Sequence, residues 1–234
     1  MDPSLILDPQ AARVVERLHV LSNRQVRLRA VTYDVLSLLN RLRGGGAEFS
    51  GTSLGKRLLS DKLVALEPEK AALCYLLCRS LKARRIVEAG TSFGVSTIYL
   101  ACAARDNTRV DGGASVVIGS EHEPVKAATA RRNFAEAGVS HLVDLREGDL
   151  RETLKDVEEP VDFMLVDIWI PMALPALELI APKLRPGAVV LCDNTVQYAR
   201  RYADYLGFVR DPVNGFRSMT LPMKGGLEMS VRVA

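Results

Sequence analysis

The chain has 234 residues, 48% of them hydrophobic, which is enough for one sizeable core but short of what two full domains usually need. No uncharged apolar run is long enough to cross a bilayer, and the first residues lack the basic and apolar regions of a signal peptide, so we expect a cytoplasmic protein. The net charge of +3 is modest, and residues 1–60 hold nine Lys/Arg against five Asp/Glu without interleaved aromatic residues. We interpret them as a solvated helix face and expect neither a nucleic-acid nor a membrane partner.

The N-terminal stretch is predicted to be helical. Apolar residues recur at three- and four-residue spacing after Asp8-Pro9, and we expect two helices that break near Ser22-Asn23 and stop at Gly44-Gly-Gly46. Residues 1–60 would form a helical extension of a domain made by residues 61–234. The extension could cover a substrate cleft or form a dimer interface, and both alternatives stay open.

From residue 61 onward helical and strand patterns alternate, which is typical of an α/β fold. Strands are expected at 85–89, 115–121, 142–146, 161–167 and 187–193. Helices are expected at 68–83, 94–105, 124–137, 150–156, 172–183 and 196–206, with a surface loop at 107–113. The segments 215–221 and 227–233, joined by a glycine-containing link, indicate an antiparallel hairpin. Together these elements predict a doubly wound, mostly parallel sheet of seven strands.

The cysteines predict no metal site. Cys74, Cys78, Cys102 and Cys192 all lie in apolar segments, and only Cys74 and Cys78 share a helix face. A zinc site would need further ligands at short spacing, so we expect buried, reduced thiols.

A glycine turn between a buried strand and a helix is the central motif. Gly90 and Gly94 are too far apart for the dinucleotide pattern G-x-G-x-x-G. They match the hydrolase pattern G-x-S-x-G, but that site needs a later histidine, and the last one, His141, precedes the middle of the sheet. An S-adenosylmethionine pocket requires an acid at the end of the first strand and another at the end of the next, which Glu88 and Glu121 supply.

Two aspartates end predicted apolar strands, namely Asp167 and Asp193, and Asn194 follows directly. Neighbouring strand ends of a doubly wound sheet lie side by side in the ligand-binding crevice. Two carboxylates and an amide oxygen suit a hard divalent cation, Mg²⁺ first and Mn²⁺ or Ca²⁺ next. Such an ion would stabilise the oxyanion of a phenol and hold it in line with a sulfonium methyl group.

Taken together, these motifs resemble the metal-dependent class I O-methyltransferases that include catechol O-methyltransferase and the caffeoyl-coenzyme A enzymes. The similarity runs from about Asp61 to the C-terminus. It depends on the stretches 87–97, 119–124, 147–149, 165–169, 191–194 and 226–228. The resemblance implies methyl transfer from S-adenosylmethionine to a hydroxyl of a small catechol-like or phenolic acceptor, and a homodimer.

The resemblance also implies roles for individual residues. The cofactor would be bound by Leu66, Glu88, Gly90, Ser92, Ser96, Glu121, His122, Asp149, Asp167 and Trp169. Within this set Glu121 would bind the ribose, Asp149 and Trp169 would flank the adenine, and His122 would lie near it. The metal ligands would be Asp167, Asp193 and Asn194. The catalytic residues would be Asp167 and Glu228, whose carboxylate would hydrogen-bond the second hydroxyl of the acceptor.

One position departs from the family pattern. The residue three after the first metal-binding aspartate is a lysine in the family, implied to be the proton acceptor, and here it is Ile170. Three explanations stay open: the metal alone acidifies the hydroxyl, a residue of the N-terminal half such as His19, Tyr33 or Lys62 serves, or the substrate differs. Two other functions also stay open: a metal-independent methyltransferase for an amine, a protein or RNA, and a cofactor-binding module without turnover.

Overall fold

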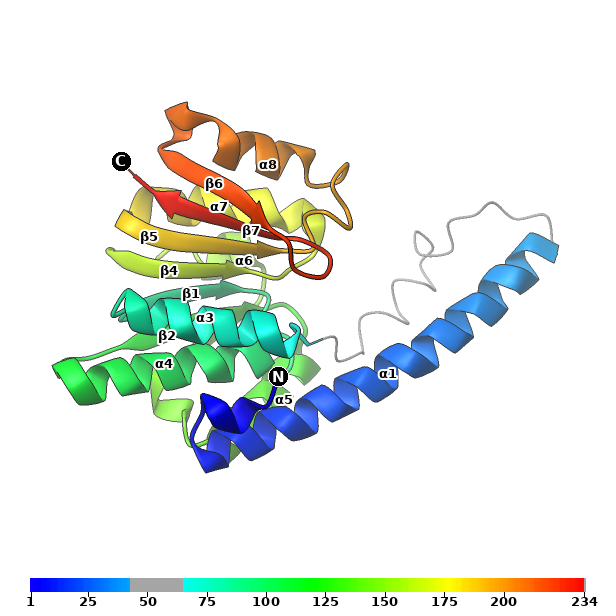
Figure 1. Cartoon of the computed structure of the whole chain (residues 1–234), viewed down its shortest axis with the longest axis horizontal. Helices are drawn as coiled ribbons and strands as arrows, with labels where there is room; N and C mark the ends of the chain where they lie inside the picture. The colour runs from blue at the N-terminus through cyan, green and yellow to red at the C-terminus, as the bar shows by residue number, and fades with distance from the viewer. Residues whose placement is uncertain (43–64, 234) are drawn as a thin grey trace.

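The computed structural model describes residues 1–42 and 65–233, with side chains for residues 1–25 and 65–233. Its centre is a sheet of seven strands in the order β3-β2-β1-β4-β5-β7-β6. The strands are β1 (Arg85–Ala89), β2 (Val116–Glu121), β3 (Val143–Glu147), β4 (Val161–Val166), β5 (Leu184–Asp193), β6 (Phe216–Leu221) and β7 (Leu227–Arg232). Strands β1 to β5 pair in parallel and β7 runs antiparallel between β5 and β6, which confirms the predicted fold class (Figure 1).

Helices cover both faces of this sheet. The α-helices are α1 (Pro9–Leu42), α3 (Pro68–Ser80), α4 (Val95–Asp111), α5 (Pro124–Glu136), α6 (Leu150–Thr153), α7 (Ala173–Ile180) and α8 (Ala203–Arg210). Short 3₁₀ helices are η1 (Pro3–Leu5), η3 (Ser140–Leu142), η4 (Ile170–Met172), η5 (Ala181–Lys183) and η6 (Pro212–Asn214). The apolar core under α1, α3, α4 and α5 is separate from the core under α6, α7 and α8.

The central strands form because their side chains are buried on both faces. In β1, Ile86 belongs to the core under α3 and α4, whereas the next residue, Val87, belongs to the core under α6 and α7. Both are fully buried, as expected for a central parallel strand rich in β-branched residues. Since the parallel strands share one direction, their carboxyl ends all reach the same edge of the sheet.

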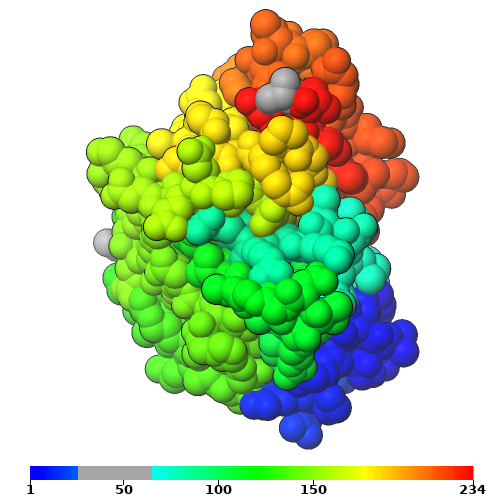
Figure 2. Space-filling view, turned by 90° about the vertical axis from the view of Figure 1, so that its left-hand side faces the viewer, coloured from blue at the N-terminus to red at the C-terminus, as the bar shows by residue number. Residues whose placement is uncertain are grey.

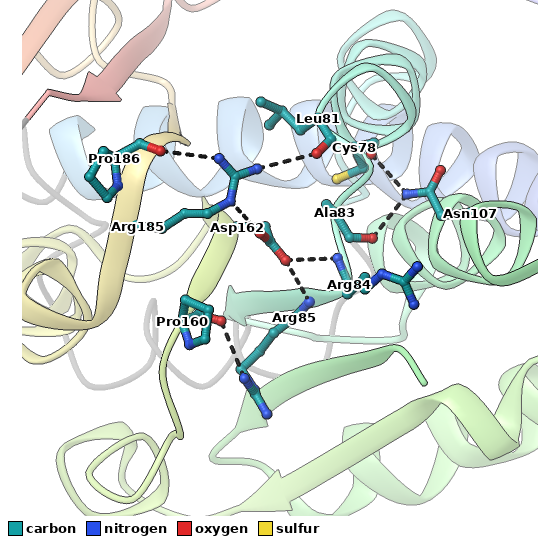
Figure 3. A network of polar contacts seen from close by, with 10 residues as sticks. All are labelled: Cys78, Leu81, Ala83, Arg84, Arg85, Asn107, Pro160, Asp162, Arg185 and Pro186. Carbon is teal, nitrogen blue, oxygen red and sulfur yellow. Dashed lines mark hydrogen bonds and ion pairs between the residues drawn. The ribbon is translucent and has the colours of Figure 1, made fainter. Parts of the chain in front are cut away.

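A polar network fixes the opposite, amino edge (Figure 3). The carboxylate of Asp162 accepts hydrogen bonds from the backbone amides of Arg84 and Arg85 at 2.8 and 2.9 Å, and from Nε of Arg185 at 2.5 Å. Arg185 also donates to the carbonyl of Leu81. These contacts tie together the starts of β1, β4 and β5. Figure 2 shows this end of the molecule. A ligand site is therefore expected at the opposite, carboxyl edge.

The predicted break near Ser22-Asn23 is wrong, because α1 is one continuous helix. Ser22 Oγ accepts the backbone N–H of Ala65 at 3.0 Å, so the serine serves a tertiary contact and does not cap a new helix. The first part of α1 packs against α4 and α5, and its second part projects away from the sheet (Figure 1). The predicted stop at residues 44–46 and the domain boundary at residue 60 lie outside the described residues.

Two further predictions are wrong for the same kind of reason. The loop expected at 107–113 is mostly helix, because α4 continues to Asp111 while the Asn107 side chain donates to the carbonyls of Cys78 and Ala83 (Figure 3). The helix expected at 196–206 begins only at Ala203, because the preceding turns are held by amide hydrogen bonds to the carbonyl of Gly225 in the β6–β7 link.

One expectation drawn from composition agrees with the structure. All four cysteines are free and buried, as predicted. None of the described helices combines the length and the apolar character needed to cross a bilayer.

Candidate functional site

The glycine turn between β1 and α4 lies at the carboxyl edge, pressed against the end of β4. Gly90 has φ +97°, and a Cβ atom there would lie 2.2 Å from the carbonyl oxygen of Asp167. The amide of Asp167 donates to the carbonyl of Ala89 at 3.0 Å, so the two strand ends are held in register. Only glycine fits this close approach, so the turn packs directly against the end of β4 where α4 begins.

Glu121 ends β2 and is held next to this turn by two backbone amides. Its Oε2 accepts the N–H of Ser92 at 2.7 Å, and its Oε1 accepts the N–H of Glu123 at 2.8 Å. Each carboxylate oxygen retains a further lone pair, so both can accept hydroxyl protons from a ribose. The residue predicted to bind the ribose is thus fixed in place by the turn predicted to hold the cofactor.

Glu88, in contrast, is buried below the turn. It is fully buried, and its carboxylate accepts hydrogen bonds from the hydroxyls of Thr91 at 3.0 Å, Ser96 at 2.5 Å and Thr97. Burial raises the pKa of Glu88 despite the three donors. Glu88 and Ser96 are therefore hydrogen-bonded to each other inside the turn and stabilise its shape. Because both are buried, neither side chain is presented to a ligand.

The residues expected around the adenine follow three different strands. His122 comes directly after β2 and is exposed, and Trp169 comes after β4 with 52% of its surface exposed. Asp149 caps α6, and hydrogen bonds from Arg151 lower the pKa of its carboxylate to about 2. Leu66, just before α3, is buried in the apolar core. All three strand ends lie at the carboxyl edge, and a half-exposed indole such as that of Trp169 is a surface on which a base can stack.

The predicted metal ligands lie at neighbouring strand ends. β4 and β5 pair in register up to Val166 and Cys192, so Asp167 and Asp193 are the next residues on adjacent strands. Asn194 follows in a left-handed conformation, φ +62°. Asp167 and Asp193 therefore follow adjacent strand ends, as the prediction requires, and their role as metal ligands stays a prediction.

Both carboxylate oxygens of Asp193 are already engaged by protein groups. Lys70 Nζ lies 2.5 Å from Oδ1, and the Asn194 side-chain amide donates to Oδ2 at 2.9 Å. The same ammonium lies 2.8 Å from Oε2 of Glu67. Among the described residues, no group of three or more His, Cys, Asp or Glu side chains is placed to hold a metal ion. The predicted set contains only two such side chains, and in this arrangement the Lys70 ammonium stands at the carboxylate that the resemblance assigns to the metal.

Electrostatics support this arrangement of charges. Burial opposes the ammonium form of Lys70, but the hydrogen bonds that it donates to Asp193 and Glu67 outweigh this effect, and the pKa of Lys70 is raised. The pKa of Asp167 is raised by its burial and by the neighbouring charge of Asp193. The site thus contains one buried ammonium among three carboxylates.

Sequence reasoning missed Lys70. It lies in the first turn of α3 and is 1% exposed, the only buried lysine among the described side chains. A signal was present in the i, i+3 spacing from Glu67 and in the small or apolar Ala71 and Cys74 that follow on the inward face. A lysine on the buried face of a helix requires a buried carboxylate partner.

The prediction for Glu228 is wrong about its direction. Glu228 pairs with Cys192 across β5 and β7, and paired residues point to the same face, which for Cys192 is the face under α7 and α8. Its carboxylate accepts hydrogen bonds from Arg210, Ser218 and Thr220. Asp193 points to the opposite face, toward α3, so Glu228 does not share its crevice.

The candidates for a proton acceptor are only partly described. Ile170 is a partly buried residue of η4, packed against the core under α6 to α8. His19 is buried, with its ring centroid 6.3 Å from that of Tyr99 on α4, so its imidazole is not presented to a ligand. The side chain of Tyr33 and all of Lys62 lie outside the described residues.

Comparisons with known proteins bear on the same segment. Residues 87–195 match the family described as a methyltransferase domain. A catechol O-methyltransferase from Niastella koreensis is 28% identical over 57% of this chain and 59% of its own length. A catechol O-methyltransferase from Mycobacterium tuberculosis is 30% identical over 57% of this chain and 58% of its own. The chain therefore spans less than two thirds of these curated relatives.

A solved structure is similar over more of the fold. The O-methyltransferase TomG from Streptomyces achromogenes, involved in tomaymycin synthesis and solved in complex with S-adenosylmethionine, is 27% identical. The match covers 76% of this chain and 86% of that protein with a TM-score of 0.64. The resemblance indicated by the motifs is confirmed.

Proposed function

We propose that this chain, whose residues 87–195 match a methyltransferase-domain family, is an S-adenosylmethionine-dependent O-methyltransferase acting on a hydroxyl of a small aromatic acceptor. The observation that carries the proposal is the pairing of Glu121 with the backbone amide of Ser92 in the glycine turn. It places a two-oxygen acceptor for ribose hydroxyls next to an open helix N-terminus.

The residues present fit the methyl donor. Glu121 is hydrogen-bonded to the glycine turn, and the exposed indole of Trp169 offers a stacking surface. When bound, S-adenosylmethionine supplies an electrophilic methyl group on a positively charged sulfur. The chain's part would be to hold the donor at the carboxyl edge of the sheet, with Glu121 at its ribose and Trp169 at its adenine.

The acceptor is proposed to be a phenol or catechol. The curated relatives are named for catechol and, in Dictyostelium discoideum, for caffeoyl-coenzyme A. In the reaction the hydroxyl loses its proton, its oxygen bonds to the methyl carbon, and the carbon–sulfur bond breaks with its electron pair going to sulfur. The products are a methyl ether and neutral S-adenosylhomocysteine.

The expected requirement for Mg²⁺ is left out of this proposal, because the Lys70 ammonium already contacts Asp193 at 2.5 Å. The expected homodimer and cytoplasmic location stay predictions. The test is incubation with S-adenosylmethionine and a panel of catechol, simple phenols and a caffeoyl thioester, with products identified by mass spectrometry. Formation of a methyl ether supports the proposal. Binding of the cofactor without methylation of any phenol would contradict it.

A further inference from the structure

Lys70 lies beside the carboxylates at the carboxyl ends of β4 and β5, where their negative charge requires a cation. Its ammonium is buried at 1% exposure, 2.5 Å from Asp193 and 2.8 Å from Glu67. Asp167 is on the adjacent strand end. Carboxylates gathered in a buried place need a positive partner, and this one is supplied by the chain itself.

A divalent ion at Asp193 would have to share the carboxylate with the ammonium or displace it. An ion bound to Asp193 would stand within a few ångströms of Nζ, since both would use the same carboxylate. Repulsion between the two cations in a poorly solvated site would weaken binding by at least about a hundredfold. The side-chain amide of Asn194 also donates to Asp193 at 2.9 Å, so its oxygen would have to rotate toward a metal.

We propose that the Lys70 ammonium takes the place of the divalent cation, so that methyl transfer proceeds without a metal. This inference rests on the proposed function. Nζ carries three donors, and its partners among the described residues, Asp193 and Glu67, use two of them. The third stabilises the oxyanion of the acceptor as its proton leaves to solvent.

The proposal also specifies the acceptor. A metal ion can chelate two adjacent hydroxyls, whereas one N–H of an ammonium contacts one oxygen. An acceptor with a single phenolic hydroxyl should therefore react as well as a catechol, within about threefold in kcat/KM. A metal-chelating site would instead favour the catechol by at least about tenfold.

The decisive experiment measures cation binding directly. Mn²⁺ is titrated into the full chain and followed by electron paramagnetic resonance, with Lys70→Ala and Lys70→Met as variants and Lys70→Arg as the charge-preserving control. Lys82→Ala is the matched surface control, because Lys82 is exposed and pairs with Asp111 at the far end of α4. We expect no stoichiometric Mn²⁺ binding by the wild type, Lys70→Arg or Lys82→Ala at about 1 mM Mn²⁺.

Removing the ammonium should open the site. Lys70→Ala and Lys70→Met should bind one Mn²⁺ at least about tenfold more tightly than the wild type, and Mn²⁺ should raise their Tm. If the wild type binds one Mn²⁺ tightly, or if no folded Lys70 variant gains binding, the proposal is overturned. Should the variants be too unstable to purify, loss of wild-type methylation on adding chelator overturns it equally, and full retention supports it.

These readouts separate the inference from the function on which it rests. Binding of S-adenosylhomocysteine and methylation of phenols are measured in parallel with and without chelator. If no phenol is methylated under either condition, the proposed function fails, whereas the Mn²⁺ titration still decides what occupies the carboxylates.

Discussion

Replacing Gly90 by alanine tests whether the glycine turn is shaped by the end of β4. The new Cβ atom would lie 2.2 Å from the carbonyl oxygen of Asp167, 2.9 Å from its carbonyl carbon and 3.1 Å from the Cβ atom of Ile168. Comfortable contacts between carbon atoms begin at about 3.5 Å. The obstructing atoms are mostly backbone, so the overlap cannot be relieved by a side-chain rotation.

Gly112 provides the matched control, because it also has a positive φ, +68°, but a Cβ atom there would meet no atom within 4 Å. Both substitutions therefore carry backbone strain of about 1–3 kcal/mol. Overpacking adds about 1–3 kcal/mol at Gly90 alone. We expect Gly90→Ala to lose about 2–6 kcal/mol of unfolding free energy and Gly112→Ala about 1–3 kcal/mol.

Urea unfolding followed by circular dichroism measures these losses, and calorimetry with S-adenosylhomocysteine measures binding. Gly90→Ala should weaken binding, because relief of the overlap must move either the turn or Asp167. Gly112→Ala should leave binding unchanged, since Gly112 ends α4 at the amino edge. Equal losses of stability and unchanged binding in both variants would refute the close approach of the turn to β4.

Three other predictions address neighbouring features. Trp169 is the only tryptophan and is half exposed, so binding of S-adenosylhomocysteine should change the fluorescence of the protein. Trp169→Ala should weaken this binding about tenfold. Unchanged emission at saturating ligand would exclude stacking on the indole. Burial lowers the pKa of His19 from 6.5, so the unfolded chain binds a proton that the folded chain does not, and stability should fall as pH drops below about 6.5. His19→Phe should reduce the dependence of unfolding free energy on pH, as measured by urea unfolding at several pH values. An unchanged dependence would show that another group causes it. Glu228→Gln should lose about 2 kcal/mol of unfolding free energy, because it weakens the contacts with Arg210. The KM for a phenol should stay unchanged. A raised KM would indicate that Glu228 contacts the acceptor.

The fold was predictable because its signals are local. Runs such as Ile86-Val87 are apolar and β-branched, and their alternation with helical patterns determines which strands are parallel. Segments whose polar side chains find distant partners were predicted wrongly. Ser22 and Asn107 look like helix breakers in the sequence, but Ala65, Cys78 and Ala83 engage them from other parts of the chain.

The site was predictable as far as strand ends specify it. Asp167 and Asp193 meet because parallel strands share an edge, and Glu121 reaches the turn for the same reason. The direction of the Glu228 side chain was not predictable from the sequence, because it depends on the register in which β7 pairs with β5. Lys70 was missed because its partner depends on how α3 packs over β5.

The central claim is that Glu121, fixed by the turn, binds the methyl donor. The most direct measurement is a calorimetric titration of S-adenosylhomocysteine into the wild type and Glu121→Ala, with Glu123→Ala as control, because only the backbone amide of Glu123 contacts Glu121. We predict one binding site in the wild type and the control, and at least about a tenfold loss of affinity in Glu121→Ala. Absence of binding by the wild type, or equal affinity in all three folded proteins, would contradict the claim.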